Sequence, residues 1–398
     1  MPMTRNPPQK ARRRHRWRSV AGVLTALAAG IAVAVPAAQA QGSHHGRPDV
    51  VQERLDHLVT DGGFPGVLAS IRGADGRVRD YTAGVGDLET GRRVPRNGAV
   101  RIGSNTKTYT AVVVLQLVAE GRIDLEATVG RYLPGVVTGN GSDSDHITIR
   151  QMLQQMSGLP DYDDVLFTEP QDLVDLAHSY YEPRRLIDAA LTRPRDFAPG
   201  QQWEYSNTNY ILLGLVAERV TERPISEEIT RRVIEPLHLT DTYWPGVGEQ
   251  RIAGRHPHGY VAVAPDAPWV DVTQMDPSLG WAAGQLISTP DDLRAFFEAL
   301  VAGDLLEPDE QAAMMTTVPA PGFEPTGDWE YGLGIARHAL PCGGYAWGHG
   351  GDIQGFETRN LVTEDGRSAV VAVTALPTSL KMLTDVSESV DAALCAAG

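Results

Sequence analysis

The feature that most constrains the fold of this chain is a helical segment, residues 106–120, that is apolar on nearly every side. Its centre, residues 111–115, reads Ala-Val-Val-Val-Leu, and Gly121 follows as a helix C-cap. A helix without a polar face is normally buried in the middle of a domain. We therefore expect the rest of the chain to pack around it, and 398 residues are enough to do so.

Strand patterns lie towards both ends of the chain, and helical patterns fill the middle. The predicted strands are residues 67–71, 77–83, 345–348, 357–362 and 367–374. Further helices are predicted at residues 50–59, 211–220, 291–300 and 386–395. This order predicts an α+β fold, in which an antiparallel β-sheet is flanked by N- and C-terminal helices and carries an inserted all-helical domain. The sheet domain would comprise residues 41–125 and 270–398, the mainly helical insertion residues 126–269, and the active site would lie in the cleft between them.

Residues 1–40 are typical of a secretory signal peptide. They contain seven basic and no acidic residues, an apolar segment of about 15 residues, and an Ala-x-Ala pattern that ends at Ala40. The alternative, a membrane anchor, is disfavoured because a spanning helix needs about 20 apolar residues. We expect a secreted protein, exported by the Sec or the twin-arginine route, with no stable membrane anchor after cleavage near Ala40. Outside the cytoplasm Cys342 and Cys395 are a plausible disulfide pair, with two free thiols as the alternative.

Composition excludes several classes of function. The chain has 50 acidic and 35 basic residues and a net charge of -15, which argues against a nucleic-acid partner. Two cysteines are too few for a four-cysteine zinc site, and the His44-His45 and His256-Pro257-His258 clusters lack further ligands. We expect no metal and no cofactor.

The first chemical motif is a serine followed one helical turn later by a lysine. Ser104 precedes the apolar helix and Lys107 lies in its first turn, so the two side chains share one face. Only three of the 35 basic residues are lysines, and arginine cannot act as a base because it does not deprotonate in proteins. A lysine with a lowered pKa could activate the serine as a nucleophile. The alternative is a capping serine beside a solvated lysine.

Two further patterns add polar groups. In Tyr205-Ser206-Asn207 the first and third side chains can face one cleft, where a phenol relays a proton and an amide binds a carbonyl. His349-Gly350-Gly351 lies beside a predicted strand and leaves N–H groups free for an oxyanion. Taken singly, these patterns also fit a turn before a helix and a β-bulge. The chain contains no Gly-x-Ser-x-Gly and no His-Glu-x-x-His motif, which excludes an α/β-hydrolase elbow and a zincin helix.

Together the patterns resemble the serine β-lactamase and penicillin-binding protein superfamily. They match its three motifs in the family's order: Ser104-x-x-Lys107, Tyr205-x-Asn207 and His349-x-Gly351. Supporting segments are Ser157-Gly158-Leu159, residues 236–242, residues 331–334 and both cysteines. The resemblance covers nearly all of the chain after residue 40 and is greatest to secreted, soluble D-alanyl-D-alanine carboxypeptidases, which are class C β-lactamase-like.

The resemblance implies a role for each matching residue. Ser104 would be the acylated nucleophile and Lys107 the base. Tyr205 would pass a proton to the leaving amine, and Asn207 would bind the acyl-side amide. His349 would keep a polar, potentially positive group beside Tyr205.

Other positions are implied to line the substrate cleft. Phe167 and Trp281 match aromatic residues of the cleft wall, and Gly351 lies where a substrate approaches. The backbone N–H groups of Ser104 and Asp352 would form the oxyanion hole.

The chain departs from the family where a carboxypeptidase holds the substrate's terminal carboxylate. The resembling enzymes use an arginine and two hydroxyl residues there, and this chain has Ala336, Gly350 and Asp352. Arg337 is adjacent but should point to the other face of its strand. Asp352 would repel a carboxylate and could hold an ammonium group. In addition, Gln155-Met156 replaces the family's common His-Thr pair.

The leading hypothesis is a secreted serine hydrolase that cleaves D-amino-acid peptide or amide bonds through an acyl-enzyme. The alternatives on the same machinery are an esterase, a D-aminopeptidase and a β-lactamase. A non-catalytic binder of cell-wall peptides is the alternative from another class. The expected partners are small peptide, amide or ester substrates, including cell-wall peptides and β-lactams.

Overall fold

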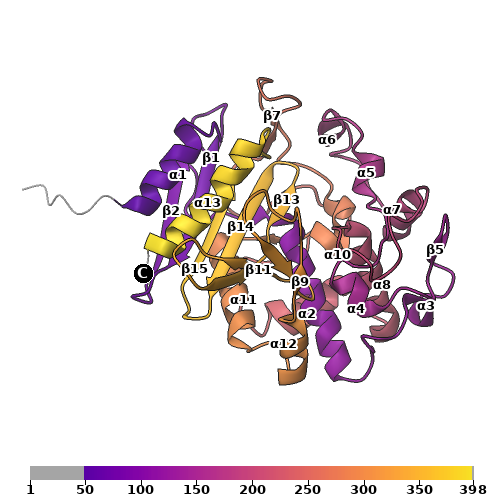
Figure 1. Ribbon diagram of the computed structural model, residues 1–398. Helices are drawn as coiled ribbons and strands as arrows, with labels where there is room; N and C mark the ends of the chain where they lie inside the picture. The colour runs from indigo at the N-terminus through magenta and orange to yellow at the C-terminus, as the bar shows by residue number, and fades with distance from the viewer. Residues whose placement is uncertain (1–48, 397–398) are drawn as a thin grey trace, which may run out of the picture. The chain divides into compact units, whose positions relative to one another are not determined.

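A computed structural model describes residues 49–396 (Figure 1). The predicted signal peptide, residues 1–40, lies outside the described residues. All described residues belong to one unit, in which a large sheet carries helices on both faces (Figure 1).

The main sheet has nine strands, and every pairing in it is antiparallel. The order across the sheet is β2-β1-β15-β14-β12-β11-β10-β9, and β13 pairs with β14. The bounds are β1 Gly66–Arg72, β2 Val78–Gly84, β9 Val318–Pro319, β10 Trp329–Tyr331, β11 Ala336–Ala339, β12 Tyr345–Gly348, β13 Gly351–Ile353, β14 Phe356–Thr363 and β15 Ser368–Val373. The N-terminal hairpin β1–β2 thus joins the C-terminal strands in one sheet, which confirms the predicted α+β fold.

Alternate residues of the central strands serve two separate cores. On β1, Val67 and Ala69 pack with α1 (Val50–Thr60) and α13 (Leu380–Ala396), whereas Leu68 belongs to the core on the other face. That second face is covered by α11 (Pro290–Ala302). Because both faces are covered, β1 and β15 are mainly apolar on both sides rather than alternating with polar residues.

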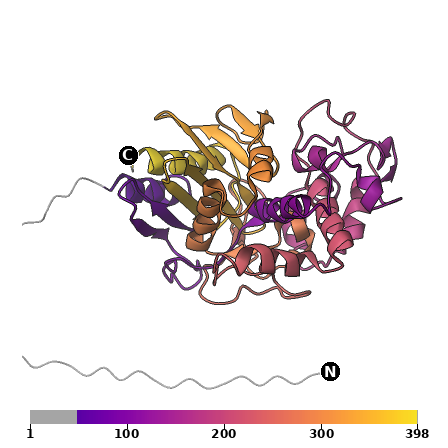
Figure 2. The same ribbon diagram turned by 90° about the horizontal axis from the view of Figure 1, so that it is seen from below.

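The remaining helices lie beside the sheet. Their bounds are α2 Thr106–Ala119, α3 Val129–Tyr132, α4 Ile149–Leu153, α5 Asp163–Leu166, α6 Asp172–Asp175, α7 Pro183–Ala190, α8 Asn207–Thr221, α9 Ile225–Ile229, α10 Trp281–Gly284 and α12 Pro308–Met314. Short helical turns are η1 Gly103–Asn105, η2 Thr230–Ile234 and η3 Pro277–Leu279. Three two-stranded ribbons pair β3 Val100–Arg101 with β8 Ile287–Ser288, β4 Thr138–Gly139 with β5 Ser142–Asp143, and β6 Tyr260–Val261 with β7 Val270–Asp271. Figure 2 shows α3 to α9 gathered on the side of α2 away from the sheet.

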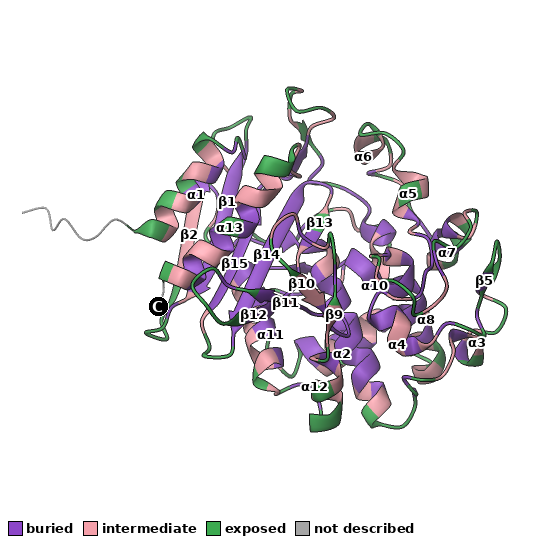
Figure 3. Ribbon diagram, viewed as in Figure 1, coloured by how far each residue is buried: buried purple, intermediate pink, exposed green. Residues whose placement is uncertain are grey.

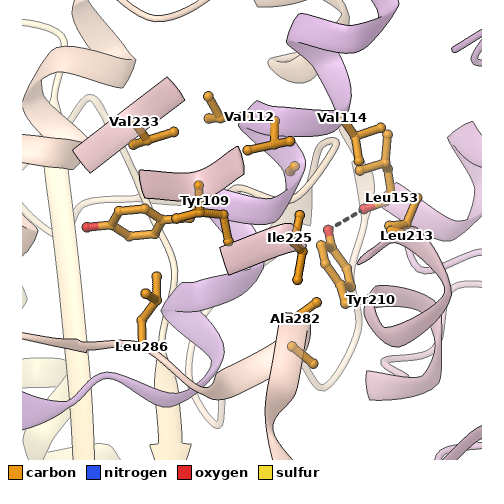
Figure 4. Close-up of a cluster of buried hydrophobic side chains, with 14 of the residues drawn as sticks. Tyr109, Val112, Val114, Leu153, Tyr210, Leu213, Ile225, Val233, Ala282 and Leu286 are labelled. Atoms are coloured by element: carbon orange, nitrogen blue, oxygen red, sulfur yellow. Dashed lines mark hydrogen bonds between the residues drawn. The ribbon is translucent and has the colours of Figure 1, made fainter. Parts of the chain in front are cut away.

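Helix α2 is buried as its composition predicts. Its residues from 106 to 115 are all buried (Figure 3). Tyr109 stacks on Phe296 of α11 at 3.7 Å between ring centroids, while Val112 and Val114 pack among residues of α8, α9 and α10 (Figure 4). Helix α2 therefore links the helices on the sheet to the helical region, and anything fixed at its start is held rigidly.

The two cysteines form a disulfide. Cys342, between β11 and β12, is bonded to Cys395 near the end of α13, with their Cα atoms 5.7 Å apart. This bond ties the last helix to the sheet. Over residues 49–396, no helix is both long and apolar enough to cross a membrane.

Candidate active site

Ser104 lies in the single turn η1, directly before α2. Gly103 adopts a left-handed φ of +47°, and a Cβ there would lie 2.8 Å from the Asp352 carbonyl oxygen and 2.9 Å from the Asp352 nitrogen. Only glycine tolerates both the conformation and the contact. The chain before Ser104 therefore abuts β13, and Ser104 and Asp352 both line one cavity of about 350 Å³. The Gly103 backbone thus lies close to that of Asp352, and the oxyanion hole formed by the Ser104 and Asp352 N–H groups stays a prediction.

Lys107 lies one turn further on and is completely buried. Its Nζ is 2.9 Å from Ser104 Oγ, 2.6 Å from Asn207 Oδ1 and 2.9 Å from the Ala283 carbonyl oxygen. Burial lowers the pKa of Lys107 to about 7, against the opposing influence of Asp161, Asp163 and Asp352.

These contacts determine what a neutral Lys107 can do. A neutral amine has two hydrogens and one lone pair. The carbonyl oxygens of Asn207 and Ala283 can only accept, so they take both hydrogens. The lone pair is then left facing Ser104 Oγ, whose hydroxyl donates to it. The arrangement is that of a base poised to remove the serine proton.

Asn207 is fixed by two aspartates that the sequence analysis did not single out. Its Nδ2 donates to Asp161 Oδ2 at 2.9 Å and to Asp163 Oδ2 at 2.8 Å, which leaves Oδ1 to face Lys107. Burial raises the pKa of Asp161 and raises that of Asp163 well above the usual range. The two carboxyl groups therefore hold fewer than two negative charges, which limits how far they stabilise a charged Lys107.

Tyr205 faces the same serine and lysine. Its ring centroid lies 4.9 Å from Lys107 Nζ. Burial raises the pKa of Tyr205 well above 10, and the nearby Ser104 hydroxyl acts in the opposite direction. Tyr205 is therefore a neutral phenol that can donate a proton across the site.

Gln155 explains one departure from the family pattern. Its carbonyl oxygen accepts from Glu204 N at 3.0 Å, and its side-chain Oε1 accepts from Ser206 N at 3.1 Å. These bonds hold the chain on either side of Tyr205. Gln155 therefore orients the second motif from a position where the family commonly has histidine.

Phe167 lines the cavity, as expected, together with Ser104, Tyr205, Asn207 and Asp352. The complete lining is Ser104, Tyr162, Asp163, Phe167, Leu173, Tyr205, Asn207, Leu279, Gly280, Ala283, Gly284, Asp352, Ile353, Gln354 and Leu376. It draws on η1, α5, α6, α8, η3, α10 and β13, so the cavity lies where the sheet meets the helical region.

Trp281 and Gly351 were expected in the substrate cleft, but neither is among the residues that line the cavity. Trp281 is not among the residues that line the cavity, because its ring lies in a notch beside Gly214 of α8, where a Cβ would be 2.7 Å from the ring. A Cβ on Gly351 would lie 2.0 Å from the Ile102 carbonyl oxygen. Gly351 thus accommodates the chain's own backbone beside Ser104 rather than a substrate.

His349 lies behind Tyr205 as the polar group that was expected there, but it is neutral and not positive. Its Nδ1 donates to the Gly350 carbonyl oxygen at 2.6 Å, so its Nε2 accepts from the Tyr331 hydroxyl at 2.9 Å. Burial lowers the pKa of His349 to about 3. The ring is 6.2 Å from that of Tyr205. His349 therefore packs against Tyr205 as an uncharged support.

Asp352 is paired with an arginine that the sequence did not indicate. Arg359 Nη1 donates to Asp352 Oδ1 at 2.9 Å, and Nη2 lies 3.3 Å from Oδ2. Arg337, by contrast, pairs with Glu330 and stacks 4.6 Å from the Tyr345 ring centroid. It is absent from the cavity lining, as its strand position predicts.

Metal ligation has no visible basis in the described part of the chain. Within residues 49–396, no cluster of three or more His, Cys, Asp or Glu side chains is arranged to hold a metal ion.

The fold and the site are those of a protein of the β-lactamase and penicillin-binding-protein type. The Beta-lactamase family profile matches residues 51–393, and the chain belongs to this family.

Two proteins of known sequence illustrate the similarity of this chain to other proteins. Penicillin-binding protein 4* of Bacillus subtilis (strain 168) is 25% identical over 332 residues, which are 77% of this chain and 67% of that protein. Protein flp of Staphylococcus aureus (strain NCTC 8325 / PS 47) is 31% identical over 193 residues, which are 47% of this chain. The chain spans only about a third, 36%, of the length of that protein.

Solved structures are also similar. A D-stereospecific amidohydrolase from Streptomyces sp. superposes with a TM-score of 0.77 at 36% identity, covering 85% of this chain and 97% of that one. A D-amino acid amidase from Ochrobactrum anthropi SV3, in complex with L-phenylalanine amide, gives a TM-score of 0.74 at 24% identity, covering 86% and 96%. At 24% identity, the similarity to the D-amino acid amidase shows that the two proteins share a fold.

Proposed function

We propose that the protein is a secreted D-amino-acid amidase and aminopeptidase that works through an acyl-enzyme on Ser104. The observation that carries the chemistry is a buried Lys107 with its pKa lowered to about 7, placed 2.9 Å from Ser104 Oγ. Export is supported by the signal-peptide pattern of residues 1–40.

Acylation begins when Lys107 takes the Ser104 proton. Ser104 Oγ then bonds to the substrate carbonyl carbon, and the carbonyl oxygen becomes an oxyanion beside the Ser104 and Asp352 backbones. Tyr205 donates its phenolic proton to the leaving nitrogen and regains one from Lys107. The C–N bond breaks, releasing ammonia or an amine, and leaves an ester on Ser104. Water then hydrolyses this ester by the reverse proton path, giving the free amino acid and Ser104.

The charge of the cavity favours a substrate with an ammonium group near the reacting carbonyl. Of the described residues that line the cavity, none is a lysine, arginine or histidine, and the two carboxyl groups are those of Asp163, whose pKa burial raises, and Asp352. A substrate carboxylate would meet no cationic side chain in this lining. An amino-acid amide brings one positive charge and no negative charge, which matches these walls.

The relatives support the same class of substrate. The Streptomyces sp. structure at 36% identity is that of a D-stereospecific amidohydrolase. Penicillin-binding protein 4*, which is 25% identical, is by its name a protein that binds penicillin. These names favour amide hydrolysis over strict carboxypeptidase action.

A substrate panel tests the proposal. It would compare D-phenylalanine amide, its L-enantiomer, D-alanyl-D-alanine as free acid and as amide, a short ester and a chromogenic cephalosporin, with Ser104→Ala as the inactive control. We expect the D-amino-acid amide to have the highest kcat/KM and the free acid to lie at least about 10-fold below its amide. A preference for the free-acid dipeptide would refute the substrate assignment, and a preference for the ester or the cephalosporin would reassign the activity.

A further inference from the structure

Arg359 is a buried cation, and all three nitrogens of its guanidinium donate hydrogen bonds. Nε donates to Glu324 at 3.1 Å, and Nη1 donates to the Thr358 carbonyl oxygen at 3.0 Å. Nη2 lies 3.2 Å from a carboxylate oxygen of Glu357. The two N–H groups that remain, one on each Nη, point to the two oxygens of Asp352. A guanidinium with two parallel free N–H groups is the fork that binds one carboxylate.

The Asp352 carboxylate lies at the boundary between this guanidinium and the substrate cavity. Asp352 lines the cavity and its side chain is 54% exposed, whereas that of Arg359 is only 7% exposed and does not line the cavity. The carboxylate therefore occupies the one free binding position of the guanidinium and places its own negative charge beside the substrate.

We propose that Arg359 is a masked carboxylate-binding site, and that Asp352 determines specificity by occupying it. Removing the Asp352 carboxylate would leave two directed N–H groups facing the vacated space beside the cavity. A small carboxylate, or the free carboxylate of a peptide substrate, would bind there. The consequence for specificity rests on the proposed amidase function, whereas the binding of a free carboxylate does not.

The neighbouring groups keep the guanidinium in place when Asp352 is changed. Glu324 and Glu357 also lie against it, Glu357 directly across the β13–β14 pair from Asp352, and burial raises the pKa of both. A Cβ on Gly350 would lie 3.0 Å from Arg359 Nη1 and 2.9 Å from Glu324 Oε1, so the absence of a side chain at Gly350 makes room for the pair. Since both glutamates remain, Arg359 keeps its hydrogen bond to Glu324 in an Asp352→Ala protein.

The first experiment measures carboxylate binding without catalysis. Acetate would be titrated by calorimetry into the wild type and into Asp352→Ala. A titration with chloride at the same ionic strength would serve as the control for nonspecific anion binding. Asp352→Asn keeps the volume of the side chain, and Asp365→Ala removes a different, exposed aspartate, which pairs with Arg367. We expect acetate to bind Asp352→Ala at least about 10-fold more tightly than the other three proteins. Equal binding to all four would overturn the proposal.

The second experiment measures specificity in the same proteins. The ratio of kcat/KM for D-alanyl-D-alanine as free acid to that for its amide should rise about 10-fold in Asp352→Ala and stay within about threefold of the wild type in Asp365→Ala. An active Asp352→Ala enzyme with an unchanged ratio would contradict the masked site. A wild type that hydrolyses neither substrate would refute the proposed function, and acetate binding by Asp352→Ala would still establish the masked site.

Discussion

Replacing Lys107 by arginine removes the base while keeping a long cationic side chain. At pH 7 a lysine with the ordinary pKa of 10.5 is neutral in about one molecule in 3,000, whereas Lys107, with its pKa lowered to about 7, is neutral in about half. An arginine at this position is essentially never neutral. Since a positioned general base contributes about 10²- to 10⁴-fold, we expect Lys107→Arg to lower kcat/KM by that factor.

The same pKa gives the direction of the pH dependence. Lys107 works in its neutral form, so activity is retained above the pKa and is lost as the pH falls through it. We expect kcat/KM of the wild type to be half-maximal near pH 7 and to fall about 10-fold for each further pH unit below about 6. His349, with its pKa lowered to about 3, stays neutral over this range, so its ionisation does not affect the pH profile.

The assay is steady-state hydrolysis of a D-amino-acid amide from pH 5 to 9. Lys381→Arg is a matched control, because Lys381 is 66% exposed on α13 and pairs with Asp385. It should leave both the rate and the profile unchanged. A Lys107→Arg enzyme that keeps more than a tenth of the wild-type activity, or a flat wild-type profile between pH 5.5 and 8, would refute the assignment of Lys107 as the base.

Three further results are expected. Tyr205→Phe should lower kcat about 10²-fold or more on amides, while a burst of acylation by a reactive ester persists; equal turnover of amides would exclude proton transfer by this phenol. Gly334→Ala should lower the free energy of unfolding by about 2 kcal/mol or more in urea, since Gly334 has φ +87° and a Cβ would lie 2.4 Å from that of Ala111. Replacing both Cys342 and Cys395 by alanine should cost about 4 kcal/mol by the loop-closure estimate for a separation of 53 residues, and an unchanged urea midpoint would contradict it.

Local features of the sequence were sufficient to predict the framework of the site. Residues 111–115, in the middle of the helix, are apolar on every side, and this alone requires burial. Ser104 and Lys107 are three residues apart at the start of that helix, so helical geometry brings them together whatever the rest of the chain does. The structure places their side-chain atoms in contact at 2.9 Å.

Features that depend on long-range packing were not predictable in the same way. Asp161 and Asp163 lie more than 40 residues from Asn207, and only the folded chain brings their side chains to its amide. The acidic run that contains them was the one signal available in the sequence. Trp281 turns towards α8 because Gly214 leaves a notch there, and no pattern around residue 281 indicates it.

Charge was equally hard to assign from residue type. His349 is flanked by glycines, as in the family motif, but its ring is buried and bonded to Tyr331, so it is neutral. Nothing in the sequence around Asp352 indicates that its carboxylate is paired with an arginine. In the structure it forms a bidentate pair with Arg359, seven residues further along, because β13 and β14 run antiparallel and place the two side chains together.

Formation of an acyl-enzyme on Ser104 is tested most directly by mass spectrometry. The protein would be treated separately with a fluorophosphonate and with a β-lactam, and the modified peptide would be sequenced. We predict an adduct on Ser104 that is absent from Ser104→Ala and forms more slowly in Lys107→Arg. No adduct with either reagent, or an adduct that persists in Ser104→Ala, would contradict the assignment of Ser104 as the nucleophile.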